Sequence, residues 1–304
     1  MHGTMTRHGK RKVDADTSEL IETMRAKLAS HSDRSFEKSQ RSRSEVVQRF
    51  VDGGGRLRDM ALFFQPPPEI SQQGGSDGDP RAERYWDPRT VWDYCDFHLF
   101  RPPFFDGTPQ APPPPTDEFD SWALALPDQG RLELMGVTWQ DDPQRIGFAK
   151  RCTATLVTGF YPVPQGPATL RLGTRFHVQG STTVLGGVPI VGPSGGWTYV
   201  APELVVSLAA YSRLDDLKVK SVMPPLRTDP TTWGTQTVDK TVSVTLDIPV
   251  EAGDIVICMA QAELRLVFFA ADGRLVGANF SSLTSLAQGP GGIEVTEMTA
   301  ALDC

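Results

Sequence analysis

Residues 168–178 read ATLRLGTRFHV, and this stretch alternates between apolar and polar side chains. The side chains at even-numbered positions are mostly apolar and would share one face of an extended chain, whereas Arg171, Arg175 and His177 would lie on the other face. A period of two is the pattern of a β-strand with one face in a core and one toward solvent. The stretch therefore predicts a half-buried strand of an antiparallel sheet.

The same period recurs on both sides of this stretch. It occurs over residues 131–139, 146–160 and 242–248, and residues 249–283 show two more segments joined by the turn Asp272-Gly273. Residues 201–216 fit both a helix and a buried strand, and we expect a strand because the neighbouring segments are strands. Roughly seven to nine strands joined by Pro and Gly turns predict a mainly β chain, an antiparallel β-sandwich of jelly-roll type.

The turn Val250-Glu251-Ala252-Gly253-Asp254 lies between two of these segments. It resembles a turn found in many β-sandwich families, among them the trimeric C1q- and TNF-like jelly rolls. The resemblance rests on one generic motif and implies only the sandwich fold that the alternation already predicts.

The first 65 residues have a different pattern and predict an N-terminal arm with a disordered start and then one or two helices. Asp16 and Glu19 have the spacing of a capping box, and an apolar stripe at helical spacing follows them. A second helical segment, residues 44–51, ends at the glycines that follow. The apolar residues of the arm need a surface to cover, on their own chain or on a neighbouring subunit. They include Leu20, Met24, Leu28, Val47 and Phe50.

Residues 66–120 predict proline-rich linkers around an aromatic wrapping segment, and residues 121–304 predict the β-sandwich domain. Trp86, Trp92 and Tyr94 lie in the aromatic segment, and Trp197 lies in a later glycine-rich stretch. Aromatic rings of this kind stack on sugars and other flat ligands, so these four are the candidate ligand-binding residues. The alternative is that the segment wraps the sheets and seals one edge of their core.

Ser194 lies in IVGPSGGW, residues 190–197, which matches the G-x-S-x-G pattern of a nucleophilic serine. All five histidines precede it, whereas the α/β-hydrolase order places the histidine after the serine, so that fold is excluded. A triad of another kind with His98 or His177 stays open, because triad order varies between folds. Cys95 and His98 lie three residues apart, and this spacing is only weak evidence for a catalytic thiol–histidine dyad. These four are weak catalytic candidates, and we predict no metal site and no cofactor.

The chain has a formal net charge of −7, with +4 over residues 1–50 and −11 over the remainder. Residues 7–12 form the densest basic cluster and are the candidate contact for nucleic acid, but the acidic body argues against specific nucleic-acid binding. No apolar run reaches the length of a membrane span, and no export-signal core follows the basic start. We therefore expect a cytoplasmic protein, or one released without a signal peptide as part of a particle.

Val267, Phe268 and Phe269 make their segment apolar on both faces, so this strand is expected to be central in its sheet and covered on its second face. Together with the arm, it favours a non-enzymatic, self-assembling structural or binding protein. The predicted partners are further copies of the chain, held by contacts of the arm in a shell, fibre or particle, and a different protein of a larger assembly. Two alternatives stay open: a carbohydrate- or other ligand-binding sandwich module, and a hydrolase on a sandwich scaffold.

Overall fold

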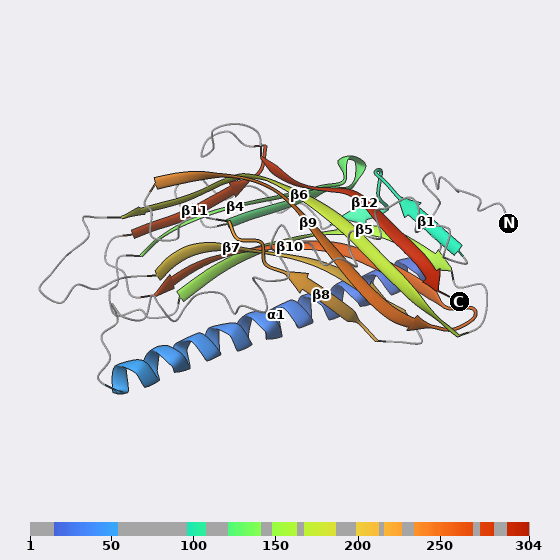
Figure 1. Cartoon of the computed structure of the whole chain (residues 1–304), viewed down its shortest axis with the longest axis horizontal. Coiled ribbons are helices and arrows are strands. Elements are labelled where there is room, and N and C mark those ends of the chain that lie inside the picture. The colour runs from blue at the N-terminus through green and yellow to red at the C-terminus, as the bar shows by residue number, and fades with distance from the viewer. Residues whose placement is uncertain are drawn as a thin grey trace, which may run out of the picture.

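The computed structural model describes residues 15–53, 96–107, 121–140, 148–162, 167–186, 199–212, 216–226, 234–269, 274–282 and 291–303. These residues form one α-helix and two antiparallel sheets that pack face to face (Figure 1). The mainly β sandwich with an N-terminal helix, predicted from the alternating segments and the apolar stripe at helical spacing, is confirmed. The helix already includes Ala15, so Asp16 lies inside it and is not its N-cap.

Each sheet has its own set of strands. Sheet A contains β1 (Asp96–Phe100), β3 (Ser121–Leu126), β4 (Arg131–Gln140), β6 (Ala168–Gly186), β9 (Gly234–Val250), β11 (Arg274–Phe280) and β12 (Gly292–Asp303). Sheet B contains β2 (Asp106–Gly107), β5 (Phe148–Pro162), β7 (Tyr199–Tyr211), β8 (Lys218–Val222) and β10 (Ile255–Phe269). A 3₁₀ turn, Pro127–Gln129, joins β3 to β4. Strands β1 and β2 come from residues that the sequence places in the linker segment.

The chain passes from one sheet to the other at almost every step. It alternates between the sheets from β4 to β7 and again from β8 to β11. In sheet A the strands β4, β11, β6 and β9 are neighbours in that order, and in sheet B the order is β5, β10, β7, β8. Such alternation between two sheets is the path of a jelly roll, as the spacing of strands and turns predicts.

The core lies between the sheets, where the period-two pattern places it. In β6, Leu170, Leu172 and Phe176 are completely buried, whereas Arg171 and His177 on the opposite face are partly exposed. Burial of each large apolar side chain contributes roughly 1.5–3 kcal/mol. The alternation of β6 is thus explained by one face in the core and one toward solvent.

Strand β7 shows why residues 201–216 fitted two kinds of element. It is a strand, as expected, and every residue from Pro202 to Ala210 is buried. One face of β7 lies in the core, and the other lies under the helix. A strand covered on both faces has no alternation to distinguish it from a buried helix.

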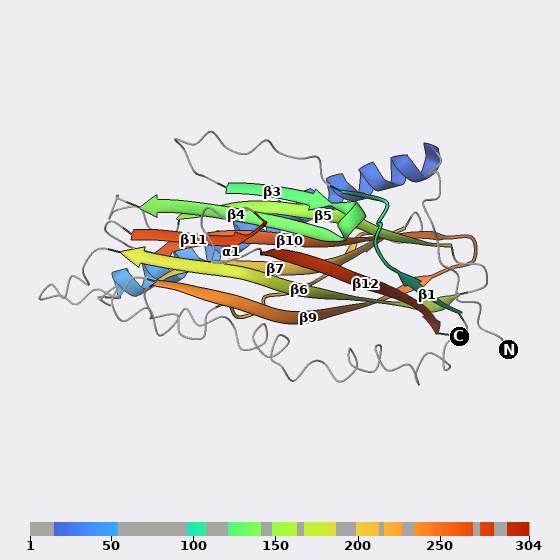
Figure 2. The same cartoon turned by 90° about the horizontal axis from the view of Figure 1, so that it is seen from above.

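The helix α1 (Ala15–Asp52) runs diagonally across the outer face of sheet B (Figures 1 and 2). The two helical segments that the sequence predicts belong to this one helix. Its apolar stripe of Leu20, Ile21, Met24 and Leu28 is buried, and it packs on Val157, Ala209, Ile257 and Met259 of the sheet. The sequence left open whether the arm covers its own chain or a neighbour, and this part of α1 covers its own chain.

Several sequence predictions fall outside the described residues. They concern the basic cluster 7–12, Trp86, Trp92, Tyr94, Cys95, Ser194 and Trp197. The backbones of Val47 and Phe50 lie in α1, and those of Val267, Phe268 and Phe269 lie in β10, but the structure does not describe these five side chains. Strand β10 pairs with β5 on one side and β7 on the other, so it is central, as expected.

No helix within the described residues combines the length and the hydrophobicity that a membrane span requires.

Candidate functional site

The outer face of sheet B changes from apolar to polar along α1. Next to the apolar stripe, Met259 of β10 faces the helix; further along β10 the same face carries Gln261, Glu263 and Arg265. These positions are two residues apart, so their side chains leave the strand on one side. All three polar side chains are buried. The polar half of this face therefore lies under the polar half of α1.

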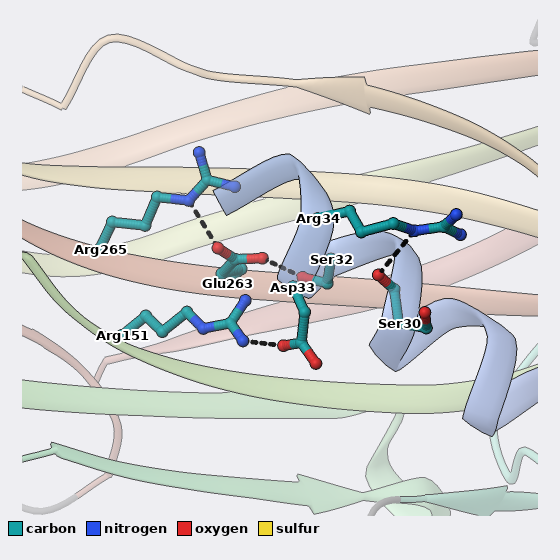
Figure 3. Close-up of polar contacts among 7 residues, drawn as sticks. All are labelled: Ser30, Ser32, Asp33, Arg34, Arg151, Glu263 and Arg265. Atoms are coloured by element: carbon teal, nitrogen blue, oxygen red, sulfur yellow. Dashed lines mark hydrogen bonds and ion pairs between the residues drawn. The ribbon is translucent and has the colours of Figure 1, made fainter. Parts of the chain in front are cut away.

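Glu263 is the centre of the polar contacts between helix and sheet. The Arg265 Nε donates a hydrogen bond to one Glu263 carboxylate oxygen at 2.5 Å, and the Ser32 hydroxyl donates to the other. Figure 3 shows Glu263 between the two donors. The Glu263 and Arg265 side chains are only 5% and 7% exposed. A buried carboxylate is tolerated here because both of its oxygens accept hydrogen bonds and an opposite charge is adjacent.

Three further contacts hold Asp33 and Phe36 of α1 on the sheet. The Arg151 guanidinium of β5 binds the Asp33 carboxylate of the helix (Figure 3). The Phe36 ring lies 4.7 Å from the Arg151 guanidinium carbon and 5.7 Å from that of Arg265. Cation–π contacts of this kind contribute about 0.5–1 kcal/mol each where water is near.

A cavity of about 150 Å³ lies between this part of α1 and the sheet. A dry cavity of about this size holds a benzene-sized ring. The lining combines eight polar side chains with four apolar ones. The polar set is His31, Ser32, Ser35, Ser207, Ser221, Gln261, Glu263 and Arg265, and the apolar set is Val205, Val219, Val222 and Met223.

Gln261 supplies the side-chain amide of this lining. The residue is 5% exposed and lines the cavity. Its register neighbour Ser207 bonds the Ser221 hydroxyl at 2.8 Å. Because an amide both donates and accepts hydrogen bonds, Gln261 offers both to water or a ligand in the cavity.

His177 lies away from this cavity, on the outer face of sheet A. Its Nε2 is 2.8 Å from the Asp239 carboxylate of β9. Hydrogen bonds from His177 and then from Gln179 hold the pKa of Asp239 below its usual value. The Asp239 side chain is 71% exposed, so the pair is a surface contact.

His98 lies on the inner side of the same sheet, because its register partner Ala300 is completely buried. Its Nε2 is 3.3 Å from the Asp96 carboxylate, which also accepts a 2.7 Å hydrogen bond from the Tyr161 hydroxyl. Burial, and then the Asp96 contact, raise the pKa of Tyr161 above its usual range. This cluster joins β1 of sheet A to β5 of sheet B. His98 and His177 are on opposite faces, so the structure does not bring them together.

The thiols of Cys152 and Cys258 are the two cysteines that the structure describes. Burial raises the pKa of Cys152 to about 12 and that of Cys258 still further. Neither thiol is a nucleophile near neutral pH. Within the described residues, no group of three or more His, Cys, Asp or Glu has the arrangement of a metal site.

The sequence analysis did not select Gln261, Glu263 or Ser32. A signal was present in β10, where the stretch IVICMAQAELRLVFF carries Gln261, Glu263 and Arg265 at alternate positions inside an otherwise apolar strand. Polar residues on one face of a central strand indicate a face that meets something other than a hydrophobic core. Ser32 gave no such signal, because a serine in a polar helical stretch is ordinarily solvated.

Comparison with known proteins gives no family for the chain: no family model and no curated protein matches it. Among solved structures it is similar to one described as TmCBM61 in complex with beta-1,4-galactotriose, with 13% identity over 63% of this chain and 88% of that chain and a TM-score of 0.21. It is also similar to the enzymatically active domain of bacteriophage CBA120 tailspike protein 4, with 10% identity over 62% of this chain and 19% of that chain and a TM-score of 0.17. At these TM-scores the similarities carry no argument about what the chain does.

Proposed function

We propose that this chain is a ligand-binding β-sandwich that takes one small, hydroxyl-rich molecule of the carbohydrate class in the cavity between α1 and sheet B. The observation that carries the proposal is the Gln261 amide, which belongs to a residue only 5% exposed and lines the cavity. A ligand with adjacent hydroxyl groups satisfies both the carbonyl and the amino group of such an amide. The assignment is the ligand-binding alternative of the sequence analysis, placed at different residues.

The chemistry of the lining supports a neutral, hydroxylated ligand. Glu263 and Arg265 neutralise each other, so the cavity has no excess charge from this pair. The remaining polar atoms belong mainly to serine hydroxyls and one amide, which both donate and accept hydrogen bonds. Val205, Val219 and Met223 form an apolar wall, which suits the apolar face of a sugar ring.

The volume limits the ligand to about one six-membered ring. A longer oligosaccharide would have to project past the exposed residues His31 and Ser35 at the edge of the cavity. The aromatic residues that the sequence nominated for stacking lie outside the described residues, so their role stays a prediction. Self-assembly of the chain also stays a prediction, which light scattering of the full-length protein would check.

Gln261→Leu is expected to weaken binding of the recognised monosaccharide at least roughly tenfold, because the ligand hydroxyls then lose their partners in a buried site. The measurement is saturation-transfer NMR with D-galactose, D-glucose and D-mannose, followed by titration of the one that binds.

The matched control is Gln179→Leu, the same change on the outer face of sheet A, where Gln179 bonds Asp239 at 3.4 Å. This variant is expected to bind the sugar as the unmodified chain does. Binding that survives Gln261→Leu unchanged, or no binding of any of the three sugars, would contradict the proposed function.

A further inference from the structure

We infer that residues 31–42 of α1, the strap segment, open and close over the cavity while residues 20–28, the anchor segment, stay docked. The role of this movement as a gate for ligand rests on the proposed function, but the movement itself does not. Both segments belong to one helix, and they differ in what holds them to sheet B.

The anchor segment is held mainly by apolar burial, beside polar contacts of Arg25 with the Gly107 carbonyl and of Lys27 with Asp216. Leu20, Met24 and Leu28 are between 0% and 7% exposed, and lifting them would expose both their own surface and the apolar patch beneath. Water offers no compensation for that exposure. The anchor segment therefore detaches from sheet B only when a large part of the structure unfolds.

The strap segment is held by polar contacts that water can replace. Ser32 bonds Glu263, Asp33 bonds Arg151, and the Phe36 ring contacts the guanidinium groups of Arg151 and Arg265. Each of these charged groups regains hydration when the strap segment lifts, so the net loss is small. The closed position also leaves both amide atoms of Gln40 buried without a hydrogen-bond partner in the described structure, which favours opening.

The same contacts couple the strap segment to the cavity. Ser32 and Ser35 line it from the helix side, and Glu263 both lines it and binds Ser32. A ligand hydroxyl that reaches Glu263 therefore meets the group that fixes the helix. Figure 3 shows Ser32 and Glu263 between helix and strand, and Ser207 and Gln261 line the same cavity from the sheet side.

Amide hydrogen exchange of the full-length protein tests the difference between the segments. We expect amides of residues 31–42 to exchange at least tenfold faster than those of residues 20–28, because a short helical segment without tertiary contacts is only marginally helical in water. Phe36→Ala is expected to accelerate exchange in the strap segment by a further factor of roughly ten, with no change in the anchor segment.

The control is Glu37→Ala, an exposed neighbour on the same helix. Alanine has the higher helix propensity in both variants, so propensity alone would slow exchange in each. Faster exchange in Phe36→Ala alone therefore reports loss of docking. Equal exchange rates in the two segments of the unmodified chain would overturn the inference. So would a Phe36→Ala variant that does not accelerate exchange, or that accelerates it in the strap and anchor segments alike.

A second measurement follows the floor of the cavity directly. A Ser207→Cys chain is labelled with a maleimide, and mass spectrometry follows the peptide that contains residue 207, with buried Cys258 as the internal standard that labels last. Phe36→Ala is expected to raise labelling at position 207 about tenfold. If position 207 is labelled as fast as an exposed thiol in the chain that keeps Phe36, no closed state exists and the inference is overturned.

Neither measurement contains a sugar, so the two proposals fail separately. If the strap segment opens but no monosaccharide binds, the movement stands and its role in ligand entry falls. If a sugar binds and Gln261→Leu weakens its binding while the two segments exchange alike, the proposed function stands and the inferred movement of the strap segment is wrong.

Discussion

Glu263→Ala is expected to lower the free energy of unfolding by about 3 kcal/mol, because it leaves the buried Arg265 guanidinium without the carboxylate that neutralises it. This value is at the lower end of the range for a broken buried ion pair. Glu203 lies opposite Arg265 in the register and supplies a second negative charge on the same face. Urea denaturation followed by far-UV circular dichroism measures the change.

Two further variants separate the charge from the packing at this position. Glu263→Gln keeps the shape and an acceptor for Ser32, and we expect it to lose less stability than the alanine variant. The double variant Glu263→Leu, Arg265→Leu removes both charges of the pair and is expected to lose less stability than Glu263→Ala. A double variant as unstable as Glu263→Ala would show instead that the buried pair itself stabilises the fold.

Met24→Ala is expected to cost about 3 kcal/mol in the free energy of unfolding. Met24 is completely buried between α1 and sheet B, in the cluster that holds Val157 and Met259. Shortening the side chain leaves a cavity in the one strongly apolar contact described for the helix, so the anchor segment is weakened. The loss is measured by urea denaturation, and binding of a hydrophobic dye reports the exposure of the apolar patch.

Ser30→Ala is the matched control for Met24→Ala, because Ser30 lies on the exposed side of the same helix. Its backbone carbonyl accepts a hydrogen bond from the Arg34 Nε at 3.2 Å, and the substitution leaves that carbonyl in place (Figure 3). Alanine favours the helix at this position, so stability is expected to be unchanged or slightly higher. If Met24→Ala were as harmless as Ser30→Ala, docking of the helix would contribute little to the fold, and the distinction between anchor and strap segments would lose its basis.

The two halves of the helix contact have different consequences for the molecule. Apolar packing at Met24 gives a fixed attachment because its loss exposes surface that water does not stabilise. The hydrogen bonds and ion pairs around Glu263 specify where the helix lies, but they contribute little net free energy because water competes for each group. A cavity at the polar half is therefore in the part of the interface that opens most easily.

The sandwich itself was predictable from the sequence because strand alternation is a local property. In β6, each side chain is assigned to core or solvent by its own position in ATLRLGTRFHV, with no knowledge of the partner strands. The apolar stripe of α1 is local in the same sense. Alternation became ambiguous only in β7, where the helix covers the second face of the strand.

The candidate site was decided by the tertiary structure alone. Ser32, Ser207 and Gln261 come from three distant parts of the chain and meet only because α1 crosses sheet B. For the same reason, the histidines that looked available for catalysis are separated: His98 faces the core, and His177 faces solvent on the other side of sheet A. Local periodicity determines which face of a strand a residue occupies, whereas the residues that share a site depend on long-range packing.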